Sequence, residues 1–355
     1  SVTCDDFAQA IADANPGSDL ARLLPQFKRW YSQAGTPRLN ATGHYDATAR
    51  TYTLTLSQSC APTPGQDTKE PFVIPVSLGL VGLSGRALPL QLADGNTPSA
   101  GSHTFVLTQA SERLTFTEVD EEPVPSILRG FSAPVVLDFD YSDAQLLALL
   151  EHDTDPFNRW EAGQRLALRR ALKAIAAEGD ATQAPVLDEA YLDAMRQVLR
   201  HPMLDAAFKE LVLTLPSEGY IAEQLDVVDP QRVHAVREAM RQQLANALQA
   251  DWAWAFDAHQ DNGAYRPDPV SSGRRALAGM ALAYLCLAAR DSGDPVWPGK
   301  TYQRFKTAGN MTDRFNALNA LVGSAHAHAE PALARFHALF KDEALVLDKW
   351  FALQA

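Results

Sequence analysis

Phe27-Lys-Arg-Trp-Tyr-Ser-Gln-Ala-Gly-Thr-Pro37 is the stretch of sequence at which the pattern of the chain changes. Before it, apolar residues recur at helical spacing, and Gly35-Thr36-Pro37 ends that pattern. From about Arg38, apolar and polar residues alternate with the period of a strand. Residues 1–36 hold two such helices, which cannot bury a core alone, so we expect their apolar faces to need a partner.

Residues 37–141 have the pattern of a β-sandwich. Tyr52, Leu54 and Leu56 alternate with threonines, and similar runs recur between turn signals such as Ser84-Gly85. Roughly seven short strands in about 100 residues are typical of an antiparallel sandwich of immunoglobulin-like size. Within one of the runs, Pro71 and Pro75 indicate an edge strand.

Residues 142–355 show helical spacing almost throughout. Ser142 is placed to cap a helix, and the pairs Asp155-Pro156 and Asp229-Pro230 put proline at a first helical position. Short helices joined by short loops predict an armadillo- or HEAT-like superhelix. Its last apolar face, around Trp350, has no polar closing unit, so we expect this domain to be truncated at its C-terminus.

Composition limits the function classes. The net charge of −12 argues against a nucleic-acid binder, because phosphate contacts need clustered basic residues. The three cysteines, Cys4, Cys60 and Cys286, are odd in number and far apart, which fits a reducing compartment. The sequence shows neither a signal-peptide pattern nor an apolar run long enough for a bilayer. We therefore predict a cytoplasmic protein without membrane or nucleic-acid partners.

Motifs for catalysis do not emerge from the sequence. A His-Glu-x-x-His helix is missing, and His326 and His328 are two residues apart, which opposes them on a helix. Nucleophile elbows and phosphate-binding glycine loops are also missing. We predict no catalytic and no metal-binding residue. Asn310, Met311, Thr312 and Asp313 start a helix, and they are the only residues for which we consider a second role, facing a substrate cavity.

Several segments together resemble the bacterial aminopeptidase N group of the M1 family of zinc metallopeptidases. They follow the order of that family and cover nearly the whole chain: Thr3-Cys-Asp-Asp-Phe7, Arg29-Trp-Tyr-Ser-Gln33, Gly35-Thr-Pro37, Tyr52-Thr-Leu-Thr-Leu56, Phe131-Ser-Ala-Pro-Val135, Asn310-Met-Thr-Asp313 and Asp348-Lys-Trp-Phe351. The resemblance implies that residues 1–36 are the helical tail of an absent, thermolysin-like catalytic domain, that residues 37–141 are a small β-sandwich, and that residues 142–355 are part of a helical superhelix.

The same resemblance implies what the chain does. The family binds zinc through the His-Glu-x-x-His motif and a further Glu, and none of these motifs occurs here. We therefore expect a non-catalytic portion without a cofactor of its own, whose full-length enzyme uses zinc to remove N-terminal residues from peptides. This portion would cap the active site and restrict substrate access. Its partners would be the remainder of the same polypeptide and, in the full enzyme, peptides.

The alternative is a stand-alone scaffold, in which the sandwich and the helical groove bind a protein partner. The two hypotheses differ in their apolar faces at Phe7, Ile11 and Phe27, and at Trp350 and Phe351. A complete scaffold should bury these faces, whereas a portion of a larger enzyme should leave them exposed or paired.

Overall fold

The computed structural model describes residues 2–95, 101–177, 179, 184–261 and 263–355. The chain divides into two compact units, residues 1–162 and 163–355, and each unit is described by itself.

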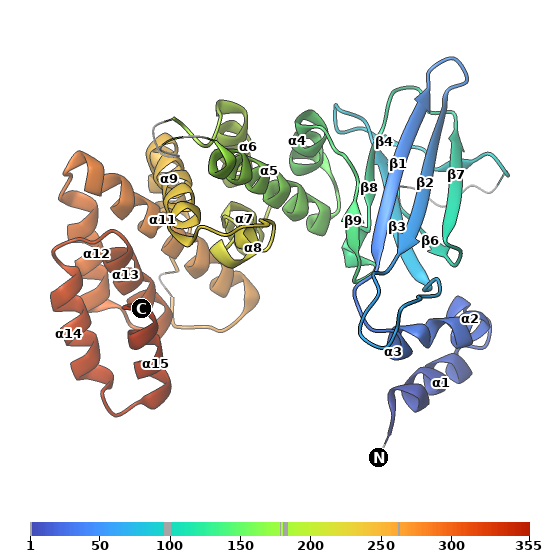
Figure 1. Ribbon diagram of the computed structural model, residues 1–355. Helices are drawn as coiled ribbons and strands as arrows, with labels where there is room; N and C mark the ends of the chain where they lie inside the picture. The colour runs from blue at the N-terminus through green and yellow to red at the C-terminus, as the bar shows by residue number, and fades with distance from the viewer. Residues whose placement is uncertain (1, 96–100, 178, 180–183, 262) are drawn as a thin grey trace. The chain divides into compact units, whose positions relative to one another are not determined.

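The first unit begins with three helices, α1 (Cys4–Ala14), α2 (Asp19–Phe27) and α3 (Arg29–Ser32). Thr3 caps α1 and forms a capping box with Asp6, which confirms the predicted helix start. Polar side chains fasten these helices to the sandwich: Trp30 Nε1 donates to the carbonyl of Val73 at 2.9 Å, and Gln26 Nε2 donates to that of Thr108 at 2.7 Å. The helix α3 lies between the first two helices and the sheets, as Figure 1 shows.

Two sheets form the sandwich. The five-stranded sheet has the order β5 (Gln91–Leu92), β7 (Ser111–Thr117), β2 (Thr51–Ser59), β1 (Arg38–Asp46), β9 (Val136–Asp138). In the second sheet the strand β3 (Ile74–Val81) pairs with β4 (Ala87–Leu88), β6 (His103–Leu107) and β8 (Val124–Ile127). The predicted fold class, an immunoglobulin-like sandwich followed by helices, is confirmed.

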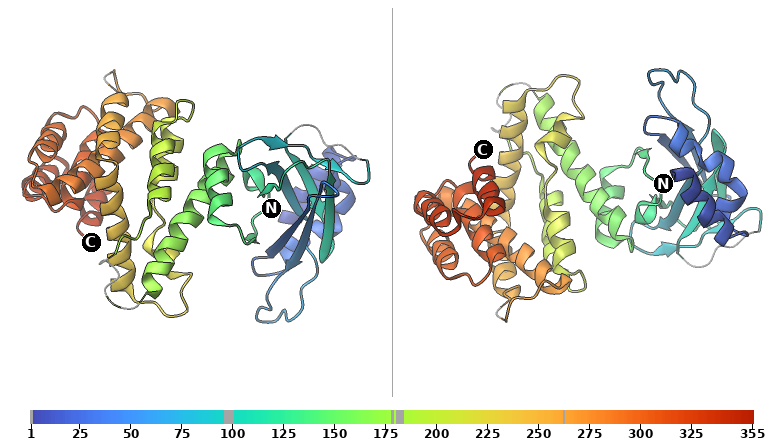
Figure 2. Two further views of the ribbon diagram at one scale, coloured as in Figure 1. Left: turned by 90° about the horizontal axis from the view of Figure 1, so that it is seen from above. Right: turned by 90° about the horizontal axis from the view of Figure 1, so that it is seen from below.

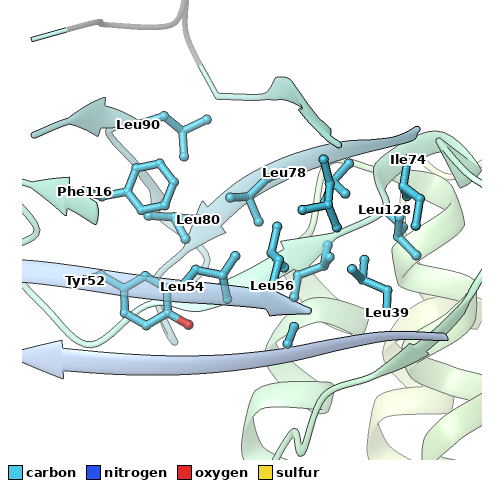
Figure 3. Packing of buried hydrophobic residues seen from close by; sticks show 14 of the residues in the cluster. Leu39, Tyr52, Leu54, Leu56, Ile74, Leu78, Leu80, Leu90, Phe116 and Leu128 are labelled. Carbon is cyan, nitrogen blue, oxygen red and sulfur yellow. The ribbon is translucent and has the colours of Figure 1, made fainter. Parts of the chain in front are cut away.

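The core of the sandwich comes from the inward residues of both sheets (Figure 3). Tyr52, Leu54 and Leu56 of β2 are buried, and the residues between them are half-exposed, as the alternation predicts. Leu78 and Leu80 of β3 meet them from the opposite sheet. Burial of such side chains is the main source of stability in a sandwich of this kind.

Two details of the sandwich differ from the sequence prediction. The pairing of β9 with β1 is parallel, whereas the other strand pairs of the described residues are antiparallel. The edge position for the Pro75 strand was wrong, because β3 is the central strand of its sheet. Pro75 pairs with Val106 on one side, and the β8 pairing starts only at Leu78, so the missing N–H of proline disturbs no ladder there.

Helices follow the sandwich. Ser142 caps α4 (Asp143–His152) in a capping box, and Asp155 accepts a hydrogen bond from Asn158 N at the start of α5 (Pro156–Ala176). The strand β1 begins at Arg38 and α4 at Asp143, next to the boundaries 37 and 142 drawn from the sequence. The division into domains at these residues, and a truncation of the helical domain, stay predictions.

The second unit consists of helices in the described residues (Figure 2). After α5 these are α6 (Glu189–Arg200), α7 (Ala206–Leu213), α8 (Glu218–Ala222), α9 (Pro230–Ala247), α10 (Gln249–Ala258), α11 (Pro269–Ser292), α12 (Val296–Thr307), α13 (Met311–Gly323), α14 (Ala329–Phe340) and α15 (Ala344–Ala352).

The helix α11 is the centre of this unit. It packs against α7, α9, α10, α12 and α13, and most of its side chains are buried. The rings of Tyr284 on α11 and Trp252 on α10 stack with centroids 4.5 Å apart, so the helical stripe predicted at Trp252 is part of the core. Among the described helices, we find none with the length and apolar content to cross a bilayer.

Candidate ligand-binding cavity in the helical unit

A cavity of about 360 Å³ lies within the second unit, where α7, α9, α11 and α13 meet. This volume is at the lower end of the range for small-molecule sites. Polar and charged side chains supply much of its lining, which consists of Glu210, Thr214, Leu215, Arg237, Arg241, Ser272, Ala276, Gly279, Met280, Ala283, Tyr284, Thr312, Asn316 and Asn319.

One wall of the cavity is a stripe of α13. Thr312, Asn316 and Asn319 follow each other at spacings of four and three, so they lie on one face of the helix. At Gly279 of α11, an added Cβ would lie 2.3 Å from Asn316 Nδ2, so the two helices approach closely here. Asn316 Nδ2 also donates to the carbonyl of Arg275 at 3.2 Å. This amide is therefore fixed in place against α11.

Two arginines of α9 bring positive charge to the cavity. Arg237 donates from Nε to the carbonyl of Pro216 at 2.8 Å, and Arg241 donates from Nη1 to both carboxylate oxygens of Glu238, at 2.7 and 2.9 Å. About a quarter of each arginine side chain is exposed, 23% for Arg237 and 27% for Arg241. These contacts orient both guanidinium groups and leave further N–H donors on each.

The acidic group of the cavity is Glu210 of α7. Its side chain is half-buried, and burial raises the pKa of its carboxyl group. Tyr284 lies close enough to the arginines to be affected by them: burial raises the pKa of its phenol to about 12, and Arg241 and Arg237 act in the opposite direction. Tyr284 therefore keeps its proton at neutral pH and offers a hydrogen-bond donor.

The segment predicted to face a substrate cavity is only partly placed at this one. Thr312 lines the cavity and is exposed. Asn310 caps α13 by accepting from Asp313 N at 2.9 Å, and Asp313 is buried and accepts from Arg304 at 3.0 Å. Met311 packs against the apolar cluster of the last helices. The structure thus brings Thr312 to a cavity, whereas whether that cavity receives substrate stays a prediction.

Sequence reasoning missed the groups that give the cavity its charge, Glu210, Arg237 and Arg241. The available signal was the position of the two arginines, which directly follow Val236 and Met240, members of the buried stripe of α9. Such a position marks the border of a helix's buried face. It predicts that the arginine stems are partly covered, but not what lies in front of their guanidinium groups.

Other candidate groups form no metal site in the described parts of the chain. In those parts, we find no group of three or more His, Cys, Asp or Glu side chains placed to hold a metal ion. The rings of His326 and His328 lie 4.9 Å apart at the start of α14. Cys286 is buried, and Thr301 Oγ1 lies 3.1 Å from its sulfur.

The arrangement of the cavity suits ligand recognition. It offers cationic donors, a carboxylate, two amides and a phenol around a volume the size of a small metabolite or peptide. These groups bind and orient polar ligands.

Family models match both parts of the chain. Residues 143–355 match the model described as "Domain of unknown function (DUF3458_C) ARM repeats", and residues 35–140 match that described as "Domain of unknown function (DUF3458) Ig-like fold". These descriptions agree with the helical unit and with the sandwich.

Curated relatives match the chain over its whole length. It is 35% identical over 355 residues to aminopeptidase N of Escherichia coli (strain K12), 37% identical over 356 residues to that of Caulobacter vibrioides, and 33% identical over 357 residues to that of Haemophilus influenzae. The matches cover 100% of this chain but only 38% to 39% of each relative. The chain therefore spans about two-fifths of the length of the relatives it matches.

A solved structure has the same fold. It is the crystal structure of Legionella pneumophila aminopeptidase A in complex with aspartic acid, with a TM-score of 0.80 and 24% sequence identity. The similarity covers 100% of this chain and 39% of that chain. At this level of identity, the comparison supports the fold alone.

Proposed function

The chain belongs to the DUF3458_C family of ARM-repeat domains, and from this premise we propose that it is the non-catalytic portion of an M1 aminopeptidase N. The observation that carries the proposal is the match to three aminopeptidase N chains along all of its length. In this proposal, the catalytic groups belong to the three-fifths of the enzyme that this chain does not cover.

The parent enzyme, in this proposal, removes N-terminal residues from peptides. Zinc would act there as the Lewis acid that polarises the scissile carbonyl, held by His and Glu side chains outside this chain. The cysteines Cys4, Cys60 and Cys286 are all free, which supports a reducing compartment, and we place the enzyme in the cytoplasm.

The role of this portion is to cap the active site and restrict access to it. Exposed apolar residues support contact with the remainder of the same polypeptide: Phe7 of α1 is 61% exposed, and so is Phe351 of α15. Thr312, exposed at the cavity, is the residue of the predicted substrate-facing segment that fits contact with peptides. Phe27 and Trp350 of the same two faces are partly buried against apolar clusters of this chain, so it is the exposure of Phe7 and Phe351 that favours a portion of a larger enzyme over a complete scaffold.

The test of the non-catalytic assignment is direct. The 355-residue chain should hold no stoichiometric zinc and should not hydrolyse an alanine anilide. A chain carrying about one zinc per molecule and turning over the anilide would refute the assignment.

The restriction of access needs the parent enzyme. Thr312→Trp should narrow the cavity, so kcat/KM should fall more for a long peptide than for an alanine anilide. Thr108→Trp, a substitution in the sandwich loop, is the control. Equal effects of Thr312→Trp on both substrates would contradict the capping role.

A further inference from the structure

Charged groups of opposite sign line the cavity of the helical unit. Among the described residues, we find no hydrogen bond or ion pair that joins Glu210 to Arg237 or Arg241. Arg237 and Arg241 line it from α9, and Glu210 lines it from α7. The role proposed above, restriction of access to an active site elsewhere, uses none of these three groups.

The two kinds of charge lie at different levels along α11. Ala207, one turn before Glu210, touches Gly273, where an added Cβ would lie 2.8 Å from Ala207 N. The arginines instead act on Tyr284, 11 residues further along α11. At a rise of 1.5 Å per residue, these levels are about 16 Å apart. Glu210 follows Ala207 by one turn of α7, so the acidic and the basic groups line different stretches of the cavity along α11.

Each charged group keeps free capacity toward the cavity. Arg237 uses Nε for a carbonyl, and its nearest acidic contact, Glu238, is 3.9 Å away. Arg241 uses Nη1 for Glu238, and its Nη2 lies 3.9 Å from the Cβ position of Gly323, at the end of α13. Glu210 makes no side-chain hydrogen bond or ion pair within the described residues, and burial alone raises its pKa. A half-buried carboxylate without a partner is stabilised by a cation that supplies one.

Neutral groups line the space between the two ends. The amides of Asn316 and Asn319 face the cavity from α13. Met280 and Ala276 face it from α11 and offer an apolar surface. Amide groups beside an apolar surface suit a peptide bond with a small side chain.

We propose that this cavity binds a free peptide of two or three residues as a zwitterion. Its ammonium group pairs with Glu210, its carboxylate accepts hydrogen bonds from Arg237 and Arg241, and its amide contacts Asn316 and Asn319. An extended dipeptide spans about 7 Å, so with a hydrogen bond of about 2.9 Å at each end it can connect groups up to about 13 Å apart. The site requires no catalysis, and it is distinct in kind from the access role proposed above.

The test is a titration of the 355-residue chain with L-alanyl-L-alanine, followed by calorimetry. N-acetyl-alanyl-alanine lacks the ammonium group, and alanyl-alanine amide lacks the carboxylate. We expect saturable binding of the dipeptide at millimolar concentrations or below, and at least a tenfold loss for each blocked peptide, because a missing partner leaves a cavity charge unpaired.

Two variants test the acidic end and the middle of the site. Glu210→Gln should weaken binding of the dipeptide about tenfold and remove the preference over the acetylated peptide, but keep the preference over the amide. Asn319→Asp, at an exposed position of the same wall, should weaken binding because it replaces an amide that contacts the peptide bond by a negative charge that repels the carboxylate. Glu189→Gln removes the same charge at an exposed position at the start of α6, so it should leave binding unchanged.

Three results would overturn the proposal: no saturable heat up to 10 mM dipeptide with the helical circular dichroism intact, equal affinity for the dipeptide and both blocked forms, or equal losses from Glu210→Gln and Glu189→Gln. Failure of the non-catalytic assignment would appear as zinc-dependent turnover by this chain, and failure of the access role as equal effects of Thr312→Trp on both substrates of the parent enzyme. Because binding is measured without turnover, the two proposals fail separately.

Discussion

Replacement of Asp153 by alanine should destabilise the first unit more than any surface ion pair can. The Asp153 side chain is fully buried, and Arg129 beside it is only 9% exposed. Asp153 accepts hydrogen bonds from Arg129 Nη2 at 2.7 Å, from Ser126 Oγ at 2.5 Å and from Asp155 N at 2.9 Å. The carboxylate thereby joins the strand β8, the turn after it and the start of α5.

The magnitude follows from what the substitution leaves behind. A hydrogen bond to a charged group contributes about 1.5–3 kcal/mol, so three such bonds would give roughly 4.5–9 kcal/mol if they were additive. Arg129 keeps its bonds to the carbonyl of Gly101 and to Thr154 Oγ1, which reduces the loss. A broken buried pair typically costs about 3–5 kcal/mol, and we expect Asp153→Ala within that range.

Hydrogen exchange followed by mass spectrometry measures the loss of stability in the first unit separately from the second. Exchange through opening of the first unit should accelerate by roughly 10² to 10⁴-fold in peptides from β8 and α4, since each 1.4 kcal/mol is a factor of ten. Peptides from α9 serve as the internal reference. Asp120→Ala is the control, because Arg50 and Asp120 form an ion pair in which both side chains are more than half exposed, and its loss should stay below about 1 kcal/mol.

A double replacement sharpens the test. Arg129→Met with Asp153→Leu removes both charges and should be less destabilising than Asp153→Ala alone, because no charge is left buried without a partner. The reasoning is refuted if Asp153→Ala changes exchange no more than Asp120→Ala, or if the double replacement costs as much as the sum of its parts.

Three further predictions concern the cap of α4, the contact between α11 and α13, and the carboxyl group of Glu210. Ser142→Ala removes the capping box of α4 and should cost about 1 kcal/mol in chemical unfolding, whereas Ser142→Asp should retain most of the stability. Gly279→Ala places a methyl group 2.3 Å from Asn316 Nδ2 and should lower stability by about 1–3 kcal/mol, a loss that Asn316→Ala should largely suppress; unchanged melting would contradict this contact. The raised pKa of Glu210 means that its ionised form is disfavoured by folding, so the penalty is absent well below the ordinary value of 4.5 and complete above the raised native value. Glu210→Gln should therefore stabilise the chain at about pH 7 and not at about pH 3, and the opposite order of the two melting shifts would disprove the assignment.

The sandwich could be predicted because its information is local. Tyr52, Leu54 and Leu56 alternate with threonines, and each of them is buried in the structure. The position of a strand within its sheet depends on distant parts of the chain. The prolines of the β3 run therefore led to the wrong prediction of an edge strand. Pro75 lacks a backbone N–H, so it needs one side of the strand without a hydrogen-bonded neighbour at its own position. The pairing with β8 begins three residues later, at Leu78. A proline therefore indicates a missing ladder hydrogen bond at its own residue, and not an edge position for the whole strand.

The helix starts were predictable for the same reason. Thr3, Ser142 and Asp229 each accept hydrogen bonds from backbone N–H groups within the next three residues, so a few adjacent letters define the cap. The segment Asn310–Asp313 shows the limit of this signal. Its capping role depends only on neighbouring residues, because Asn310 accepts its hydrogen bond from Asp313 N. The exposure of Thr312 at a cavity depends instead on other helices.

The cavity could not be predicted from the sequence, because each helix that lines it has the common pattern of an apolar stripe bordered by polar residues. Arg237 and Arg241 border the apolar stripe of α9, where long basic side chains commonly cover the edge of a core with their stems. Whether their charged ends meet water, a carboxylate or a hollow is decided by α7 and α13, which are separated from α9 in sequence and brought to it by packing on α11. A glycine at 279 lets α13 approach α11 until Asn316 touches the backbone. The position of that amide, and with it the width of the cavity, is therefore a property of the pair of helices, and the Gly279→Ala and Asn316→Ala variants test it together.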